Sequence, residues 1–251
     1  MSLSPGTATK TCEKHGEYEA RNIGNPGGET LYSQCPKCME ERQKRYEEEE
    51  RREAERQRQW RISSYLTQSG IPKRYKDKTL DDLQFTTSHQ IKNLRTVKNY
   101  LKALVNETSA SLILCGKPGT GKTHIGTALV SAAICDAIIE SQYISIGQIL
   151  RKVKSTYNRN SEQTEDQIYY HFGVLPFLVI DEVGVQFGTD SEKMIFFEVI
   201  NRRYENMLPT VLISNLTVEE LTGFIGERVM DRFKEDQGAV LAFDWDSYRG
   251  K

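Results

Sequence analysis

The chain has 251 residues, enough for one sizeable hydrophobic core and a small additional module. Charged residues make up 27% of it but the formal net charge is only −1, which excludes a global basic field that would attract nucleic acid. The longest apolar stretch, 128–139, is too short to span a bilayer and contains Asp136, and residues 2–19 show no apolar signal region. We therefore expect a cytoplasmic protein without a membrane partner, in which disulfides are rare.

Three cysteines and a histidine near the N-terminus form two short pairs of metal-ligating residues. Cys12 and His15 make the first pair and Cys35 and Cys38 the second, with a polar loop expected between them. Each pair can place two donors on one turn, so two such turns can close a tetrahedral shell around Zn²⁺. The segment is too short and polar to bury its own core, and a metal would supply the missing folding energy. These features predict a zinc-binding module over 1–39, with a disordered tail carrying free thiols, or a disulfide, as the alternatives.

Residues 40–69 are dominated by Glu, Arg and Gln and contain neither glycine nor proline. Opposite charges at helical spacing predict a solvated helix, and the lack of an apolar stripe argues against a regular coiled coil. Gly70-Ile71-Pro72 ends this run. We therefore expect a charged helical linker over 40–69 and the main domain over 70–251.

The segment 116–123 matches the phosphate-binding loop pattern G-x-x-x-x-G-K-[ST] at every fixed position. The apolar run 111–115 before it predicts a buried strand, and the Ala-rich stretch 125–139 after it predicts a helix whose N-terminus favours an anion. Lys122 would reach the β and γ phosphates of ATP and the Thr123 hydroxyl would hold Mg²⁺, whereas an ordinary glycine-rich turn is the alternative. The predicted nucleotide-binding residues of the loop are Gly116, Lys117, Pro118, Gly119, Thr120, Gly121, Lys122 and Thr123.

Two later apolar runs end in polar residues that can complete this site. The run 177–182 ends in Asp181 and Glu182, a Walker B pattern in which Asp181 would hold Mg²⁺ and Glu182 would orient the attacking water. The run 210–215 ends in Asn215, which would bond the γ-phosphate or that water if both runs are parallel strands ending at one edge. An ordinary strand-to-loop asparagine is the alternative for Asn215. The glutamate favours an Mg²⁺-dependent ATPase over a passive nucleotide binder.

Strands and helices alternate along the main domain. Residues 91–105 and 147–157 carry apolar residues at helical spacing, whereas 142–146 and 239–243 are short apolar runs typical of strands. This alternation predicts a three-layer α/β domain with a mainly parallel sheet.

The main domain resembles the DnaC family of replicative helicase loaders, within the AAA+ ATPases, from about Gly70 to the C-terminus. The likeness rests on the phosphate loop, the 177–182 strand, Gly-Glu-Arg-Val-Met-Asp-Arg at 226–232 and Trp-Asp-Ser-Tyr-Arg at 245–249. It implies an ATPase that binds a replicative DnaB-type helicase hexamer, delivers it onto single-stranded DNA and releases it after ATP hydrolysis.

The resemblance also implies roles for single residues. Asn215 matches the sensor 1 residue of the family, and Arg249 matches the sensor 2 arginine. Arg232 matches the arginine finger, with Arg228 as the second candidate. An arginine supplied by a neighbouring subunit would stabilise charge on the transferred phosphoryl group, which implies self-association through the AAA+ domains.

The N-terminal cysteine cluster departs from the best-known DnaC pattern. It looks more like phage-type DnaC proteins, and it is similar to the DnaI loaders in having a zinc-bearing N-terminal domain. In those families the N-terminal part docks on the helicase, and domain order extends that expectation to this chain.

A local basic cluster offers a DNA contact. Arg151, Lys152, Lys154 and Arg159 crowd one predicted helix and the loop after it, while Tyr157 is expected on the apolar side of that helix. Initiator and loader AAA+ proteins line a path for single-stranded DNA near this point, where basic side chains and a stacking aromatic suit the backbone and bases. A solvated basic face is the alternative.

Two other functions compete with the loader. An IstB-like transposition helper shares the ATPase core and works with a transposase on duplex DNA. A metal-stabilised adaptor with a vestigial ATPase is the second rival, and the intact Lys122, Asp181 and Glu182 argue against it.

Overall fold

The computed structural model describes residues 6–24, 30–106, 110–158, 160–184, 189–235 and 238–248. The chain divides into two compact units, Met1–Trp60 and Arg61–Lys251. Among the described residues, no helix is both long enough and apolar enough to cross a membrane.

The N-terminal unit contains a two-stranded antiparallel hairpin. β1 (Thr7–Cys12) pairs with β2 (Gly16–Arg21), and Cys12 lies opposite Gly16 at the closed end of the hairpin. The expectation of a loop throughout the segment between the two ligand pairs was therefore wrong. Strand β2 was not predicted because its residues are mostly polar, and only Tyr18 and Ala20 turn away from solvent.

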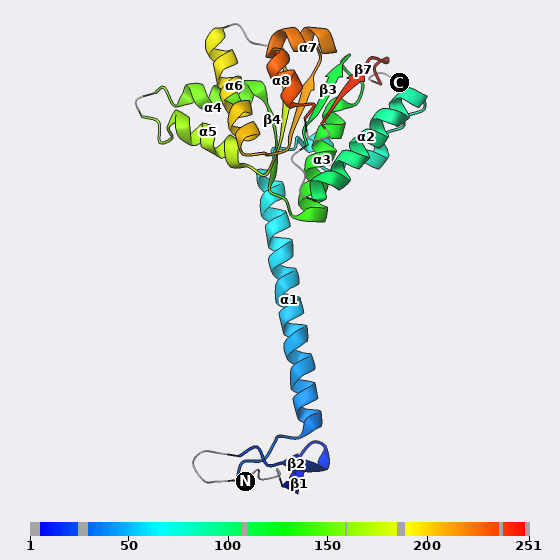
Figure 1. The fold of residues 1–251 in the computed structure, drawn as a ribbon, viewed down its shortest axis with the longest axis vertical. Coiled ribbons are helices and arrows are strands. Elements are labelled where there is room, and N and C mark those ends of the chain that lie inside the picture. Colours follow the sequence, from blue (N-terminus) through cyan, green and yellow to red (C-terminus); the bar gives the residue numbers. More distant parts are fainter. Residues whose placement is uncertain are drawn as a thin grey trace. The chain divides into compact units, whose positions relative to one another are not determined.

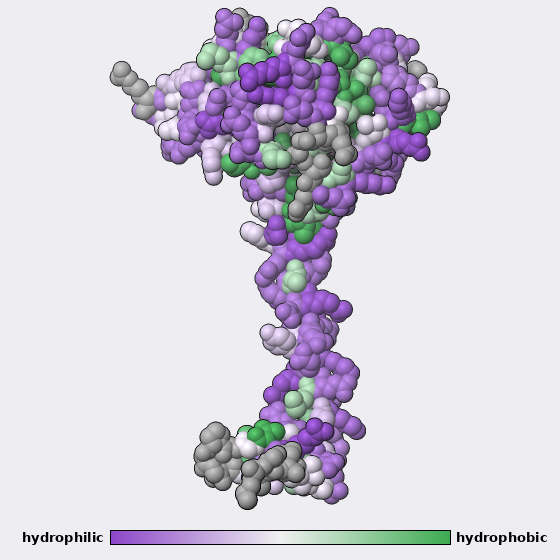
Figure 2. All heavy atoms as spheres, viewed as in Figure 1, coloured by the Kyte–Doolittle hydropathy of each residue, from purple (hydrophilic) through white to green (hydrophobic). Residues whose placement is uncertain are grey.

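The predicted charged helix is present and longer than expected. α1 (Pro36–Gln68) begins with proline, whose fixed φ suits the first helical turn, and ends before Gly70, which has a φ of +70°. It buries none of its described residues, and Figure 2 shows its surface to be largely hydrophilic. Ion pairs at helical spacing, such as Lys44 with Glu40 at 2.7 Å, support it along its length.

The second unit is built on five parallel strands in the order β4-β5-β6-β3-β7 (Figure 1). The strands are β3 (Leu112–Gly116), β4 (Ser141–Ser145), β5 (Phe177–Val183), β6 (Thr210–Ser214) and β7 (Ala239–Phe243). All five follow the apolar runs of the sequence, and their carboxyl ends meet at one edge. The prediction of an α/β domain with a mainly parallel sheet is confirmed.

Helices cover both faces of this sheet. They are α2 (Ser88–Val105), α3 (Lys122–Ala137), α4 (Ile146–Ser155), α5 (Glu165–Val174), α6 (Asp190–Glu205), α7 (Val218–Ile225) and α8 (Glu227–Arg232), with short 3₁₀ helices η1 (Lys73–Tyr75) and η2 (Leu80–Asp82). Alternate strand residues divide the core: Leu112 and Leu114 pack with α2 and α3, whereas Ile113 and Cys115 pack with α4 to α8. The domain therefore has three layers.

A buried arginine on α6 donates hydrogen bonds to the end of α5 and to the start of β6. Arg203 is only 1% exposed, and its guanidinium donates to the carbonyls of Phe172, Leu175 and Pro209 and to the Thr210 hydroxyl. Burial lowers the pKa of Arg203 to about 9. Because this pKa is still above neutral pH, the side chain stays charged there.

Replacing Arg203 with methionine should lower the free energy of unfolding by about 3 kcal/mol or more, because three buried carbonyls lose their donor. Urea denaturation measures this change. Arg202→Met is the matched control, since Arg202 forms partly exposed ion pairs with Glu198 and Asp166 and should cost less than about 1 kcal/mol. Equal losses in the two variants would contradict the structural role of Arg203.

Candidate ATP-binding and metal sites

The phosphate loop connects β3 to α3 and is anchored to β7. Gly116 has a φ of +117°, and a Cβ there would lie 2.5 Å from the carbonyl oxygen of Phe243. The Lys117 N–H donates to the same oxygen at 2.8 Å. Gly121, with a φ of +101°, then leads directly into the first turn of α3. Glycine is therefore required at 116 by both backbone conformation and space.

Lys122 lies beneath the loop that it is predicted to serve. Its Nζ donates to the carbonyls of Gly116 and Lys117, each at 2.6 Å, and its side chain is buried. The Thr120 hydroxyl closes the loop by donating to the Lys117 carbonyl at 2.8 Å. The loop is thus wrapped around a positive charge, as phosphate binding requires.

Asp181 and Thr123, the two residues predicted to hold Mg²⁺, are brought together. The Thr123 hydroxyl donates to Asp181 Oδ2 at 2.9 Å, although the two residues lie on different elements. Asp181 Oδ2 also accepts from the Tyr143 hydroxyl at 2.6 Å, and Oδ1 accepts from the Glu182 N–H at 2.6 Å. Burial and the neighbouring carboxylate raise the pKa of Tyr143, which keeps its proton on the donating oxygen. The chemistry of this donor set fits a hard cation such as Mg²⁺.

Glu182 has a backbone conformation that is rare outside glycine. Its φ is +63°, and the pairing of β5 with β6 shifts register between Ile180 and Val183. This irregularity turns the exposed Glu182 into the cavity while Asp181 stays buried. The Ser214 hydroxyl donates to the Val183 carbonyl at 2.6 Å, which fixes the end of β6 and places Asn215 at the same cavity.

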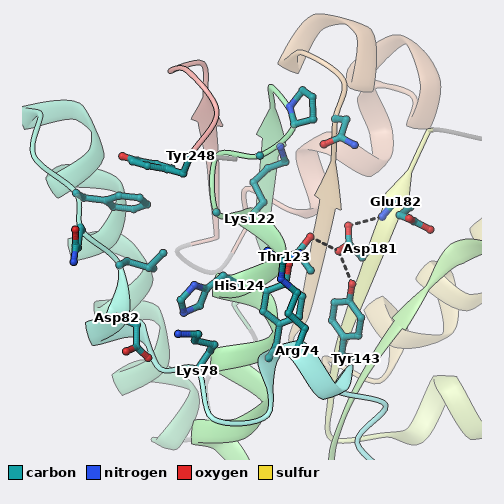
Figure 3. Close-up of a pocket in the computed structure, with 18 residues that line it drawn as sticks. Arg74, Lys78, Asp82, Lys122, Thr123, His124, Tyr143, Asp181, Glu182 and Tyr248 are labelled. Carbon is teal, nitrogen blue, oxygen red and sulfur yellow. Dashed lines mark hydrogen bonds between the residues drawn. The ribbon is translucent and has the colours of Figure 1, made fainter. Parts of the chain in front are cut away.

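One cavity of about 970 Å³ lies at the carboxyl edge of the sheet (Figure 3), and the predicted site residues that line it are Lys122, Thr123, Asp181, Glu182 and Asn215. The position follows the general rule that ligands of parallel sheets bind beyond the strand ends. One wall consists of the segment around η1 and η2, which contributes Arg74, Lys78, Leu83 and Phe85. This wall could not be predicted from the sequence, because the segment has no motif and no regular periodicity.

The C-terminal segment packs against the phosphate loop. The Tyr248 N–H donates to the Gly119 carbonyl at 2.9 Å, and the Tyr248 ring stacks on Phe85 with ring centres 6.1 Å apart. Trp245 contacts Phe85 and Phe243 through its ring. The motif at 245–248 therefore has a place at the ATP cavity, whereas Arg249 lies outside the described residues.

The two candidates for the arginine finger lie away from the cavity of their own chain. Arg232 donates to the Asn201 side chain and lies over the Tyr204 ring at 4.3 Å, and it lines a separate cavity of about 330 Å³. Arg228 is exposed at the start of α8. Neither lines the described ATP cavity, so a role in hydrolysis requires a neighbouring subunit.

The predicted zinc ligands converge in the N-terminal unit. The four donor atoms of Cys12, His15, Cys35 and Cys38 all lie within 4.8 Å of one another. The Cys12 and Cys38 sulfurs are 3.4 Å apart, and His15 Nδ1 lies 3.3 Å from the Cys38 sulfur and 3.7 Å from each of the other two. A tetrahedral zinc site with Zn–S bonds of about 2.3 Å places neighbouring sulfurs roughly 3.8 Å apart. The cluster therefore fits Zn²⁺.

Two further features suit this cluster to a metal. Hydrogen bonds, led by that from the Lys14 N–H, lower the pKa of Cys12 to about 6, whereas the contact with Cys12 raises the pKa of Cys38 to about 11. The two sulfurs therefore share a proton, which a bound metal would displace. His15 Nε2 donates to Glu41 Oε1 at 2.9 Å, which directs Nδ1 toward the sulfurs. Glu41 lies 26 residues from His15 in a charge-rich helix, so no local pattern indicated it.

The residues predicted to contact DNA lie at the surface. Arg151, Lys152 and Lys154 are exposed on α4, and Lys154 pairs with Glu192 at 2.6 Å. Tyr157 is 58% exposed and follows the end of α4, so the expectation that it shares the apolar side with Leu150 and Val153 was wrong. The helix ends at Ser155, two residues too early to carry Tyr157 back to the core. Arg159 lies outside the described residues.

Comparison with known proteins identifies the family. The profile described as "IstB-like ATP binding protein" matches residues 41–251. The chain belongs to this IstB/DnaC-like family of AAA+ ATP-binding proteins. Replicative helicase loader DnaC of Escherichia coli (strain K12) is 32% identical over 198 residues, covering 77% of this chain and 78% of the relative. DnaC of Buchnera aphidicola subsp. Acyrthosiphon pisum is 31% identical over 189 residues, covering 75% and 76%.

Solved structures of other proteins share the fold of this chain. The crystal structure of the DnaC helicase loader has a TM-score of 0.60 at 22% identity, covering 69% of this chain and 100% of that one. The DnaI crystal structure has a TM-score of 0.58 at 18% identity, covering 72% and 96%. AMPPCP-bound DnaA from Aquifex aeolicus has a TM-score of 0.57 at 20% identity, covering 70% and 52%. The prediction of an AAA+ domain is confirmed.

Proposed function

We propose that this protein is an ATP-dependent helicase loader that binds a replicative DnaB-type hexamer and delivers it onto single-stranded DNA. The observation that carries the proposal is the assembled ATP cavity, in which Lys122, Thr123, Asp181 and Glu182 converge, in a chain 32% identical to a replicative helicase loader. We propose three functional segments along the chain, a zinc module over 1–39, a helical linker over 40–69 and an ATPase domain over 70–251.

The predicted site residues divide the tasks of ATP binding and hydrolysis among them. Lys122 and the loop N–H groups bind the phosphates, and Thr123 and Asp181 would hold Mg²⁺, which neutralises charge on the transferred phosphoryl group. Glu182 orients and polarises the attacking water as its base, and Asn215 bonds the γ-phosphate or that water. Arg232 or Arg228 of a neighbouring subunit, and Arg249, complete the charge stabilisation, which makes hydrolysis depend on self-association.

ATP acts here as a switch, because it binds the assembled domains more tightly than the free ones. The zinc module, in which Cys12, His15, Cys35 and Cys38 would hold the metal, docks on the helicase. Four protein ligands leave no open position on the metal, so the module binds a partner and does not catalyse.

Native mass spectrometry of the full chain with replicative helicase hexamers, Mg²⁺ and ATP tests this function. We expect several copies on one hexamer, and loss of the complex after zinc chelation. Failure to bind any replicative helicase, together with binding of a transposase and duplex DNA, would establish the transposition helper instead.

Reversing the charge of the α4 cluster should weaken binding to single-stranded DNA. The variant changes Arg151, Lys152 and Lys154 to Glu, and we expect an affinity loss of about 10-fold or more, with a shallower salt dependence because fewer phosphates are neutralised. Fluorescence anisotropy of a labelled oligonucleotide at several salt concentrations measures both. The matched control reverses the charge of three residues on α2, Lys92, Arg95 and Lys102. An equal loss of affinity in this control would show that only the net charge of the protein matters.

A further inference from the structure

Among the described residues, three groups donate hydrogen bonds to Asp181, and one of them comes from outside the nucleotide-binding motifs. Thr123 belongs to the phosphate loop and the Glu182 N–H to the strand of Asp181 itself, whereas Tyr143 belongs to β4. β4 is the neighbour of β5 in the sheet, and Tyr143 stands opposite Val179. Its hydroxyl therefore reaches along the sheet to a carboxylate two residues nearer the carboxyl edge. Figure 3 shows the two side chains pointing toward each other.

This contact holds the orientation of the carboxylate. Tyr143 fixes Oδ2 at 2.6 Å while the Glu182 N–H fixes Oδ1 at 2.6 Å, so both oxygens of Asp181 are held. A carboxylate held in this way is already aimed when a metal arrives, and outer hydrogen bonds of this kind tune metal affinity. Thr123 cannot provide the same support, because its own hydroxyl is a predicted ligand of the metal.

The backbone of Tyr143 is joined to the end of α1. The Tyr143 N–H donates to the carbonyl of Ser69 at 2.7 Å, immediately after the helix ends at Gln68. Ser69 is only 1% exposed, and a Cβ on Gly70 would lie 2.2 Å from the Tyr143 carbonyl oxygen. β4 is an outer strand of the sheet, so residues 69–70 cover the edge at which Tyr143 lies. A displacement of the end of α1 therefore moves the residue that holds Asp181.

We propose that Tyr143 is a positioning residue for the magnesium-binding carboxylate of Asp181, and that it couples this carboxylate to the end of the linker helix. The inference rests on the proposed ATP-binding function. Tyr143 lines the same cavity, and in this role it acts through Asp181.

The test is a Mg²⁺ titration of nucleotide binding by the full chain, followed with a fluorescent ATP analogue. Tyr143→Phe keeps the ring and removes only the donor, and the half-saturating Mg²⁺ concentration should rise about 10-fold or more. In EDTA, without Mg²⁺, the variant should bind the analogue as tightly as the wild type does. A general loss of structure would weaken this binding as well. Tyr100→Phe is the matched control, because the Tyr100 hydroxyl is buried with no hydrogen-bond partner among the described residues.

A second pair of variants tests the coupling to α1. Gly70→Ala places a methyl group against the Tyr143 carbonyl and should raise the Mg²⁺ requirement in the same direction. Gly223→Ala is its control, since a Cβ at Gly223 meets no atom within 4 Å. A normal Mg²⁺ requirement in a folded Gly70→Ala protein would overturn the coupling.

The remaining outcomes separate this inference from the proposed function. An unchanged Mg²⁺ requirement in Tyr143→Phe would overturn the positioning role while leaving ATP binding intact. A wild-type protein that shows no Mg²⁺-dependent nucleotide binding would overturn the proposed function itself.

Discussion

Lys122→Ala is expected to abolish nucleotide binding, with an affinity loss of about 100-fold or more. The Nζ of Lys122 is the positive charge at the centre of the phosphate loop, where it bonds the carbonyls of Gly116 and Lys117. An alanine leaves the β and γ phosphates without the cation of Lys122, whose side chain is buried, where charge interactions are stronger than in water. Isothermal titration with Mg²⁺ and ATP measures the affinity.

Glu182→Gln is the matched variant, because it keeps the size of the side chain and removes the base. It should bind ATP with nearly normal affinity and lose turnover by about 100-fold or more, which would trap the complex with the helicase. Phosphate release measures turnover. A wild type that releases no phosphate above background would identify an adaptor with a vestigial ATPase, whereas equal release above background in both proteins would contradict the role of Glu182.

Removal of one zinc ligand should unfold the β1-β2 hairpin of the N-terminal unit while leaving the ATPase domain intact. Cys35→Ser leaves three donors of the cluster, and structural zinc contributes about 10–16 kcal/mol of apparent binding free energy in small modules. Metal analysis should show loss of the bound zinc, and hydrogen exchange should show loss of protection in β1 and β2 alone. Binding of ATP should be unchanged.

Two further variants sharpen this zinc test. Cys135→Ala should retain zinc, because Cys135 lies outside the cluster. Glu41→Ala should keep the four ligands but lower metal affinity by about 10-fold or more, since it frees the His15 ring. If the wild-type protein carries no metal and its mass is lower by two hydrogens, the cluster forms a disulfide and not a zinc site.

Short local motifs allowed much of the site to be predicted from the sequence. The phosphate loop, the pair Asp181 and Glu182, and the spacing of Cys12 to His15 each carry their chemistry within a few residues. The central strands β3, β5 and β6 of the main domain were predicted because each is a short apolar run buried on both faces. The hairpin β1-β2 was missed and Tyr157 was misplaced, because polar strands and helix ends leave a weak periodic signal.

The sequence by itself determined the candidate chemistry of this protein: a predicted loop for phosphate, two acids predicted for a metal and water, and four donors that fit zinc. Only the tertiary structure showed what supports that chemistry, namely Tyr143 beside Asp181, Glu41 beside His15, and the wall of the cavity that includes Phe85. The physical reason is sequence separation. Tyr143 and Asp181 lie 38 residues apart, and their hydrogen bond exists because β4 and β5 pair in one register. Such a contact depends on the packing of the whole sheet and leaves no pattern within either segment.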